Sequence, residues 1–136
     1  IGIWFSYYIY LSHFIIFNLK FYWFILMKLD YSKSWILQKL TAIVFLLFLI
    51  YLVFSLKNIN LSKHDELLIW FSSYFNFFSF TLLFSAILIH SKLGLSSIID
   101  DYIHNIKVKK KILFLKNLSL ITIYVTVMGI LIRAII

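Results

Sequence analysis

A single histidine stands at the end of an otherwise uncharged apolar run, where an imidazole could do chemistry. His90 directly follows residues 67–89, which contain no charged side chain. An ionisable group beside a membrane span is costly, so it usually faces the interior of a helix bundle and has a partner. Position alone leaves two interpretations open. His90 is either a ligand for a cofactor or a hydrogen-bond donor to a backbone carbonyl.

Small and polar side chains share one helical face with His90. The face is predicted to comprise Ser72, Ser79, Ala86, His90 and Gly94. At 100° per residue these positions fall within about 40° of one line along a helix. Such a face lets another helix, or a flat ligand, approach closely. Helix packing is the simplest prediction for this face and for a second stripe, at Ser119, Thr122, Thr126, Gly129 and Arg133.

The composition requires a lipid environment for much of the chain. Of the 136 residues, 63% are hydrophobic and 13% are charged, and the mean hydropathy is +0.99. Soluble domains have about half apolar and about a quarter charged residues. Three runs, at about 35–56, 67–90 and 112–136, are long enough to cross a bilayer, since a spanning helix needs about 20 apolar residues. They are apolar on all faces, which predicts helices rather than barrel strands.

The first 30 residues are rich in aromatic side chains and are predicted to form an extension, apart from a three-helix membrane anchor at 31–136. Ser6, His13 and Lys20 are seven residues apart and so share one helical face. This favours an amphipathic helix in the membrane interface, where Trp and Tyr are enriched. A fourth spanning helix is the competing interpretation. The fold class is therefore an all-α membrane protein with three transmembrane helices and an N-terminal interfacial helix or extension.

The distribution of basic residues predicts how the spans are oriented. Loops rich in Lys and Arg stay on the cytoplasmic or matrix side of a membrane. The basic residues gather before the first span and before the third, at Lys20, Lys28, Lys33, Lys39, Lys92, Lys107, Lys109, Lys110, Lys111 and Lys116. The others are Lys57, Lys63 and Arg133. With three spans, this predicts an N-terminus on the inside and a C-terminus on the outside.

Composition also excludes several classes of function. The chain has no cysteine, which excludes disulfides, thiolate zinc sites and iron–sulfur clusters held by this chain. It has no glycine-rich loop that could hold flavin phosphates. The net charge is +8, and the basic residues that produce it lie mostly between apolar runs, where they are expected to meet anionic lipid rather than nucleic acid. A small transporter or channel would need several charges or broken helices within the membrane, and the sequence indicates neither.

The segment LIHSKLGLSSIIDDY at 88–102 resembles the signature of the smaller membrane-anchor subunit of succinate dehydrogenase, respiratory complex II. That signature has a histidine at the end of the second span, a glycine four residues on, and an Asp-Tyr pair eleven and twelve residues on. His90, Gly94, Asp101 and Tyr102 match all four elements. The preceding FTLLFSAI at 80–87 is similar to bacterial members. QKLTAI at 38–43 resembles the start of that family's first span, so the resemblance runs from about residue 35 to the C-terminus.

The resemblance implies a b-type haem held between this chain and a second membrane subunit. His90 would supply one axial nitrogen to the haem iron, and the partner would supply the other. Neutral imidazole suits haem iron, and two histidines suit electron transfer rather than oxygen binding. Lys39 would correspond to a basic residue near a haem propionate, where family members often have arginine. Its alternative role is a lysine that extends to the lipid headgroups.

The same resemblance implies a ubiquinone site at the Asp-Tyr pair. Tyr102 would donate a hydrogen bond to a quinone carbonyl oxygen, and this bond strengthens as the oxygen gains negative charge on reduction. Asp101 would orient the site or relay protons, since the quinone takes up two protons with its two electrons. The alternative for Asp100 and Asp101 is a solvated loop that balances nearby lysines.

The function implied by the resemblance is that of a subunit without independent activity, within the succinate:ubiquinone oxidoreductase of the tricarboxylic acid cycle and respiratory chain. Its partners would be the second membrane anchor, the iron–sulfur subunit and the flavoprotein. The residue usage is that of AT-rich codons, which indicates the mitochondrial inner membrane, with a bacterial inner membrane as the alternative. Two other functions stay open: an accessory subunit of another respiratory complex, and fumarate reductase of the related type.

Overall fold

The computed structural model describes the backbone of residues 2–135 and the side chains of Ser12 and residues 15–133. The described chain forms five helices and no strand: α1 (Gly2–Leu26), α2 (Tyr31–Leu56), α3 (His64–Ser72), α4 (Tyr74–Tyr102) and α5 (Ile106–Ile135). Three of them, α2, α4 and α5, are long and apolar enough over their described residues to cross a membrane. This confirms the predicted all-α membrane fold. The side chains of Ser6 and His13, which underlie the amphipathic prediction, lie outside the described residues.

Two of the three predicted spans form continuous helices that begin earlier than expected. The first, α2, starts directly after Asp30, whose carbonyl accepts the Ser34 amide at 2.9 Å. The third, α5, starts after Asn105, whose side-chain oxygen accepts the amides of Lys107 at 3.0 Å and Val108 at 3.3 Å. Asparagine is a strong helix N-cap. Both helices therefore extend past the apolar runs into charged residues, and the start of α5 is marked by the Asn105 cap and not by hydropathy.

The predicted second span is wrong at its start, because the helix is broken at Ser73. That residue has extended backbone angles and separates α3 from α4. Asn76 stabilises the break, since its side-chain amide donates to the Trp70 carbonyl at 2.9 Å at the end of α3. The hydroxyl of Tyr51 in α2 donates in turn to the Asn76 side-chain oxygen. The chain thus turns here through contacts between three helices.

Helix α3 is a short connecting element that ties the far end of α2 to the bundle. Trp70 is buried, and its indole N–H donates to the Ser55 hydroxyl of α2 at 2.8 Å. At the start of α3, the Glu66 carboxylate accepts the Asn60 amide at 2.8 Å and pairs with Lys63 at 3.0 Å. These bonds lower the pKa of Glu66 below its ordinary value.

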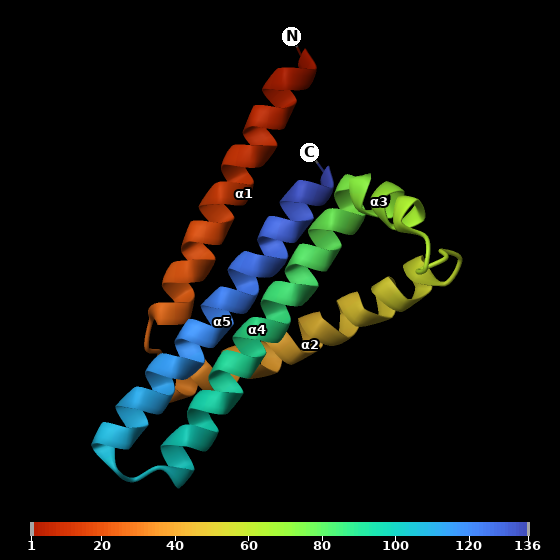
Figure 1. Cartoon of the computed structure of the whole chain (residues 1–136). Helices are drawn as coiled ribbons and strands as arrows, with labels where there is room; N and C mark the ends of the chain where they lie inside the picture. The colour runs from red at the N-terminus through yellow and green to blue at the C-terminus, as the bar shows by residue number, and fades with distance from the viewer. Residues whose placement is uncertain (1, 136) are drawn as a thin grey trace.

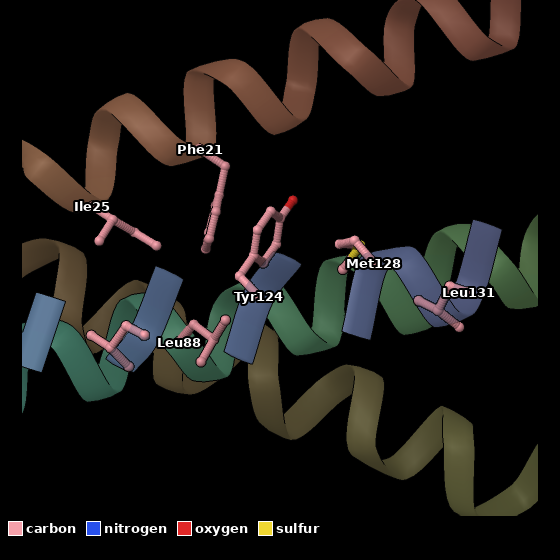
Figure 2. Packing of buried hydrophobic residues seen from close by; sticks show 7 residues of the cluster. Phe21, Ile25, Leu88, Tyr124, Met128 and Leu131 are labelled. Carbon is pink, nitrogen blue, oxygen red and sulfur yellow. The ribbon is translucent and has the colours of Figure 1, made fainter. Parts of the chain in front are cut away.

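Helix α4 is central, since each of the other four helices contacts it. In Figure 1, α1 and α5 run side by side along it, and α2 crosses it and diverges toward α3. The buried core lies between α1, α4 and α5 and consists of Phe21, Ile25, Leu88, Leu120, Tyr124, Met128 and Leu131. Figure 2 shows Phe21 and Ile25 directed from α1 into this core.

Helix α2 is the most exposed of the long helices. Thr41 is its only buried residue, and apolar side chains cover its outer surface, at Ile36, Leu40, Ile43, Leu46, Leu47, Ile50, Val53 and Phe54. In water this surface would be unfavourable, because apolar area is costly to hydrate. In a membrane it faces lipid or another helix. Helix α2 therefore lies between the rest of this chain and the surrounding lipid or neighbouring helix.

Candidate functional site

His90 makes a direct hydrogen bond across the contact between α4 and α2. Its Nδ1 lies 3.1 Å from the backbone carbonyl oxygen of Gln38, and the side chain is half-buried. A carbonyl can only accept, so Nδ1 carries the proton and donates. This confirms that His90 hydrogen-bonds a backbone carbonyl, which was one of the two interpretations from sequence.

Thr41 supports the carbonyl that His90 contacts. Its hydroxyl lies 2.9 Å from the carbonyl oxygen of Leu37 and 3.1 Å from that of Gln38, and its side chain is only 7% exposed. Threonine commonly bonds back to the preceding helical turn in this way. The two separate segments that carry the resemblance, around Thr41 and around His90, are therefore brought together by the fold.

Gly94 allows the two helices to approach one turn beyond His90. A Cβ atom at this position would lie 3.3 Å from the side-chain nitrogen of Gln38. Ser79 and Ala86 are buried on the predicted small-residue face. Ser72 is not part of that face, because it lies in α3 before the break. The predicted face is therefore confirmed as a packing surface from Ser79 to Gly94.

The bond to Gln38 leaves His90 in a state that fits a metal ligand. With Nδ1 protonated, the lone pair of the neutral imidazole is on Nε2, which has no hydrogen bond to the described residues. Histidines that bind metal usually donate their other N–H to a carbonyl or carboxylate, which fixes the ring and raises its basicity. The donor set at His90 therefore suits the iron of a haem.

Asp101 and Tyr102 lie at the end of α4, away from His90. The separation is eleven and twelve residues, or about 17 Å along the helix axis. Asp101 returns to within about 20° of the face that carries His90, whereas Tyr102 is about 120° around the helix. Tyr102 is 80% exposed, and neither side chain has a polar partner among the described residues. Both side chains are therefore exposed on the surface of this chain.

Asp100 differs from its neighbour because it is engaged within the chain. Its carboxylate lies 2.6 Å from the ammonium of Lys109 in α5, and this pair bridges the turn between α4 and α5. This pair fits the predicted alternative, in which an aspartate of this loop balances a nearby lysine. Asp101 is left without such a partner in the described part of the chain, so the two adjacent carboxylates have different surroundings.

Lys39 is exposed on the outer side of α2. Its ammonium lies 5.8 Å from the centre of the Trp35 ring one turn earlier, a weak cation–π contact. Gln38, which precedes it, faces His90. Lys39 is therefore next to Gln38 in sequence, but it does not contact His90.

Two lysines with defined partners were not identified as such from the sequence. Lys92 is 5% exposed, and its ammonium donates to the carbonyls of Phe24 at 2.5 Å and Met27 at 2.8 Å. Lys116 donates to the Ser96 hydroxyl at 2.5 Å. From sequence, Lys92 and Lys116 are predicted only to be charges near a membrane boundary. Their position close to apolar runs was a signal that they need partners.

The second predicted stripe does not pack against another helix within the described chain. Its hydroxyls bond back to carbonyls of α5 itself: Ser119 to Leu115, Thr122 to Leu118 and Thr126 to Thr122. A Cβ atom on Gly129 would meet nothing within 4 Å. Among the residues whose side chains the structure describes, no helix meets the packing prediction for this stripe.

Comparison with known protein families gives one match, and it covers most of the chain. Residues 26–126 match the family described as the succinate dehydrogenase/fumarate reductase transmembrane subunit. No curated protein and no solved structure matches the chain. The matched range includes α2, α3, α4 and both segments that meet at His90. The chain therefore belongs to the family of succinate dehydrogenase/fumarate reductase transmembrane subunits.

Proposed function

We propose that this chain anchors a succinate dehydrogenase in the mitochondrial inner membrane, supplies His90 as one axial ligand of a b-type haem, and contributes to ubiquinone reduction through Asp101 and Tyr102. The observation that carries the proposal is the hydrogen bond from His90 Nδ1 to the Gln38 carbonyl at 3.1 Å, which leaves Nε2 as the ligand nitrogen. The family match supports the anchor role at the level of a transmembrane subunit of such an oxidoreductase.

In the proposed haem site, this chain and the second membrane anchor each supply one ligand. A haem bound here would supply one-electron transfer between the iron–sulfur subunit and the quinone region. His90 would hold the haem iron from this chain, and the second membrane anchor would supply the other ligand. The Gln38 carbonyl and Thr41 keep the imidazole in one tautomer and one orientation. Lys39, exposed at the same level of α2, is proposed to extend to a haem propionate as a single positive charge.

The quinone role requires groups that are free to face a substrate. Tyr102 is 80% exposed at the end of α4, and its phenol can donate to a quinone oxygen. Asp101 is exposed and has no partner in the described chain, so its carboxylate would be free to pass protons from water to a quinone. Partner subunits would close this region from water and complete the pocket.

The anchor role uses the rest of the membrane surface. The basic residues at 107–111, together with Lys28 and Lys33, lie at one end of the helices. They are proposed to meet anionic lipid headgroups or the iron–sulfur and flavoprotein subunits on the inner side of the membrane. The accessory role in another respiratory complex is the alternative, and the family match counts against it.

The test is a comparison of two histidine variants in the assembled, membrane-bound complex. We expect His90→Ala to abolish the reduced-minus-oxidised absorption band of haem b. His104→Ala is the matched control, because His104 is exposed beyond the end of α4 and is assigned no ligand role. It should keep the full band.

Two results would count against the proposal. An unchanged haem band in His90→Ala would remove its ligand role. Copurification of this chain with the subunits of another respiratory complex, and without a flavoprotein and an iron–sulfur protein, would favour the accessory role instead.

A further inference from the structure

Lys92 is a buried lysine that holds the end of α1. Its ammonium donates to the carbonyls of Phe24 and Met27 and lies 4.5 Å from the centre of the Phe24 ring. The last carbonyls of a helix have no partner within the helix, and a lysine there satisfies them and interacts favourably with the helix dipole. The inner end of α1 is thus attached to α4 at the level of Lys92.

From this attachment, α1 runs along α5 in the opposite direction. The ring of Phe21 stacks on Tyr124 with centroids 4.1 Å apart, and Ile25 is fully buried. Further along, Ile15 of α1 and Ile132 of α5 line the same groove. Figure 1 shows the two helices side by side, and Figure 2 shows Phe21 and Ile25 directed at Tyr124 and Leu88. The axis of α1 therefore follows that of a spanning helix over residues 15–25.

The length and charge of α1 suit a membrane crossing. It has 25 residues, so it is about 37 Å long, compared with about 30 Å for the hydrocarbon core. Lys20 is its only Lys or Arg and lies within two turns of the end held by Lys92, where an exposed lysine can extend to the headgroups. We infer that α1 crosses the membrane as a fourth helix, with its inner end held by Lys92 and its start on the opposite side.

This arrangement differs from an interfacial helix in direction. A helix in the interface lies across the spanning helices, in the plane of the membrane. Here Phe21 stacks on Tyr124, and Ile15 and Ile132 line one groove further out, so α1 runs along α5 and not across it. The basic residues still gather at one end of the bundle, because α1 ends and α2 begins there. A fourth span is therefore consistent with the positive-inside pattern. Compared with the three-span topology, it changes only the side of the membrane on which the first residues lie.

The crossing also determines which side of α4 is available to a partner. His90 and Lys92 are two residues apart, so their side chains are about 200° apart around the helix. Helix α1 covers the side of α4 and α5 that carries Lys92 and Tyr124. It leaves the side with His90 and α2 uncovered by α1. The inference about α1 does not depend on haem, and it fails or holds separately from the proposed function.

The absence of cysteine makes the crossing directly testable in the assembled complex. Single variants Gly2→Cys, Ser32→Cys and Ser62→Cys place one thiol at the start of α1, at the start of α2 and in the loop before α3. Sealed membrane vesicles of one orientation are treated with a membrane-impermeant maleimide. We expect Gly2→Cys and Ser62→Cys to label from the same side, and Ser32→Cys from the other. Labelling of Gly2→Cys from the Ser32→Cys side, or from neither side, would overturn the inference.

The role of Lys92 has its own test, which uses cleavage by trypsin at Lys28 in the connection after α1. We expect Lys92→Met to speed this cleavage several-fold in the assembled complex, because the carbonyls of Phe24 and Met27 lose their donor. Lys92→Arg keeps a cationic donor and should resist cleavage nearly as well as the unchanged chain. Lys110→Met removes an exposed lysine and serves as the matched control. Equal cleavage rates in Lys92→Met and Lys110→Met would show that Lys92 does not hold the end of α1.

Discussion

The imidazole of His90 and the backbone carbonyl of Gln38 are joined by a hydrogen bond of 3.1 Å, across the contact between α4 and α2. The bond spans 52 residues of sequence and links the two segments that resemble the anchor subunit. It selects the tautomer with a free Nε2 lone pair, and it ties the helices at one level of the membrane. The orientation of this side chain is therefore established by contacts within the chain itself.

Gly94 should be intolerant of large side chains because Gln38 lies against it. A Cβ atom would already be 3.3 Å from the Gln38 side chain. We expect Gly94→Leu to separate α2 from α4 and to destabilise the complex by about 1–3 kcal/mol, as overpacking does. Gly129→Leu is the control, since nothing lies within 4 Å of a Cβ there. Heat-induced dissociation of the solubilised complex measures both, and equal losses would contradict the packing described here.

The adjacent aspartates should respond differently to the same change. We expect Asp101→Asn and Tyr102→Phe to lower kcat/KM for ubiquinone about tenfold each, the effect of losing one hydrogen bond of about 1.4 kcal/mol. Asp100→Asn removes only the pair with Lys109, which is partly exposed and is worth about 1 kcal/mol or less.

The measurement for these variants is succinate oxidation with ubiquinone, beside oxidation with a soluble dye that takes electrons before the quinone site. The dye-linked rate should be unchanged in all three. A loss in Asp100→Asn as large as that in Asp101→Asn would remove the distinction between the carboxylates.

The indole of Trp70 should stabilise the connection between α2 and α3. Trp70→Phe keeps a buried ring and removes the N–H that donates to Ser55 at 2.8 Å. We expect a loss of about 0.5–1.5 kcal/mol, and a similar coupling energy in a double-mutant cycle with Ser55→Ala. Ile69→Ala, at a position 71% exposed, is the control and should have a smaller effect on unfolding. Additive effects of the Trp70 and Ser55 variants would show that the bond contributes nothing.

The loop before α3 should loosen in acid because of Glu66. Its bonds to the Asn60 amide and to Lys63 hold the pKa of Glu66 below 4.5. A depressed carboxyl pKa stabilises the folded loop above the ordinary pKa, and this stability is lost as the pH falls through the lowered value. The protection of the Asn60 amide, measured as its exchange relative to the intrinsic rate at each pH, should therefore fall as acid protonates Glu66, and Glu66→Gln should leave this amide poorly protected at every pH. Asp65→Asn should retain the pH dependence, and its loss there would assign the effect to the wrong carboxylate.

Helices α2, α4 and α5 could be predicted as membrane helices because their length and hydropathy decide this. Helices α2 and α5 begin several residues before the predicted starts, and for α5 the Asn105 cap extends the helix into charged sequence. The break at Ser73 could not be predicted from an uninterrupted apolar run. It depends on Asn76 reaching the Trp70 carbonyl and on Tyr51 of another helix.

The site was predicted in part for a similar reason. His90 was identified from its place beside an uncharged span, but a pattern along the chain does not show which carbonyl it contacts. The partners of Lys92 lie 65 and 68 residues away. The seven-residue spacing in α1 indicates a shared face, but it carries no information on whether the helix axis lies across or along the others. Such features depend on tertiary contacts.

A structure of the assembled complex in its membrane tests the central claim most directly. The account predicts that His90 Nε2 binds a haem iron between α2, α4 and a helix of the sister subunit, while Nδ1 still donates to Gln38. An imidazole that faces lipid, with no porphyrin beside it, would contradict the account and leave the chain as a hydrophobic anchor alone.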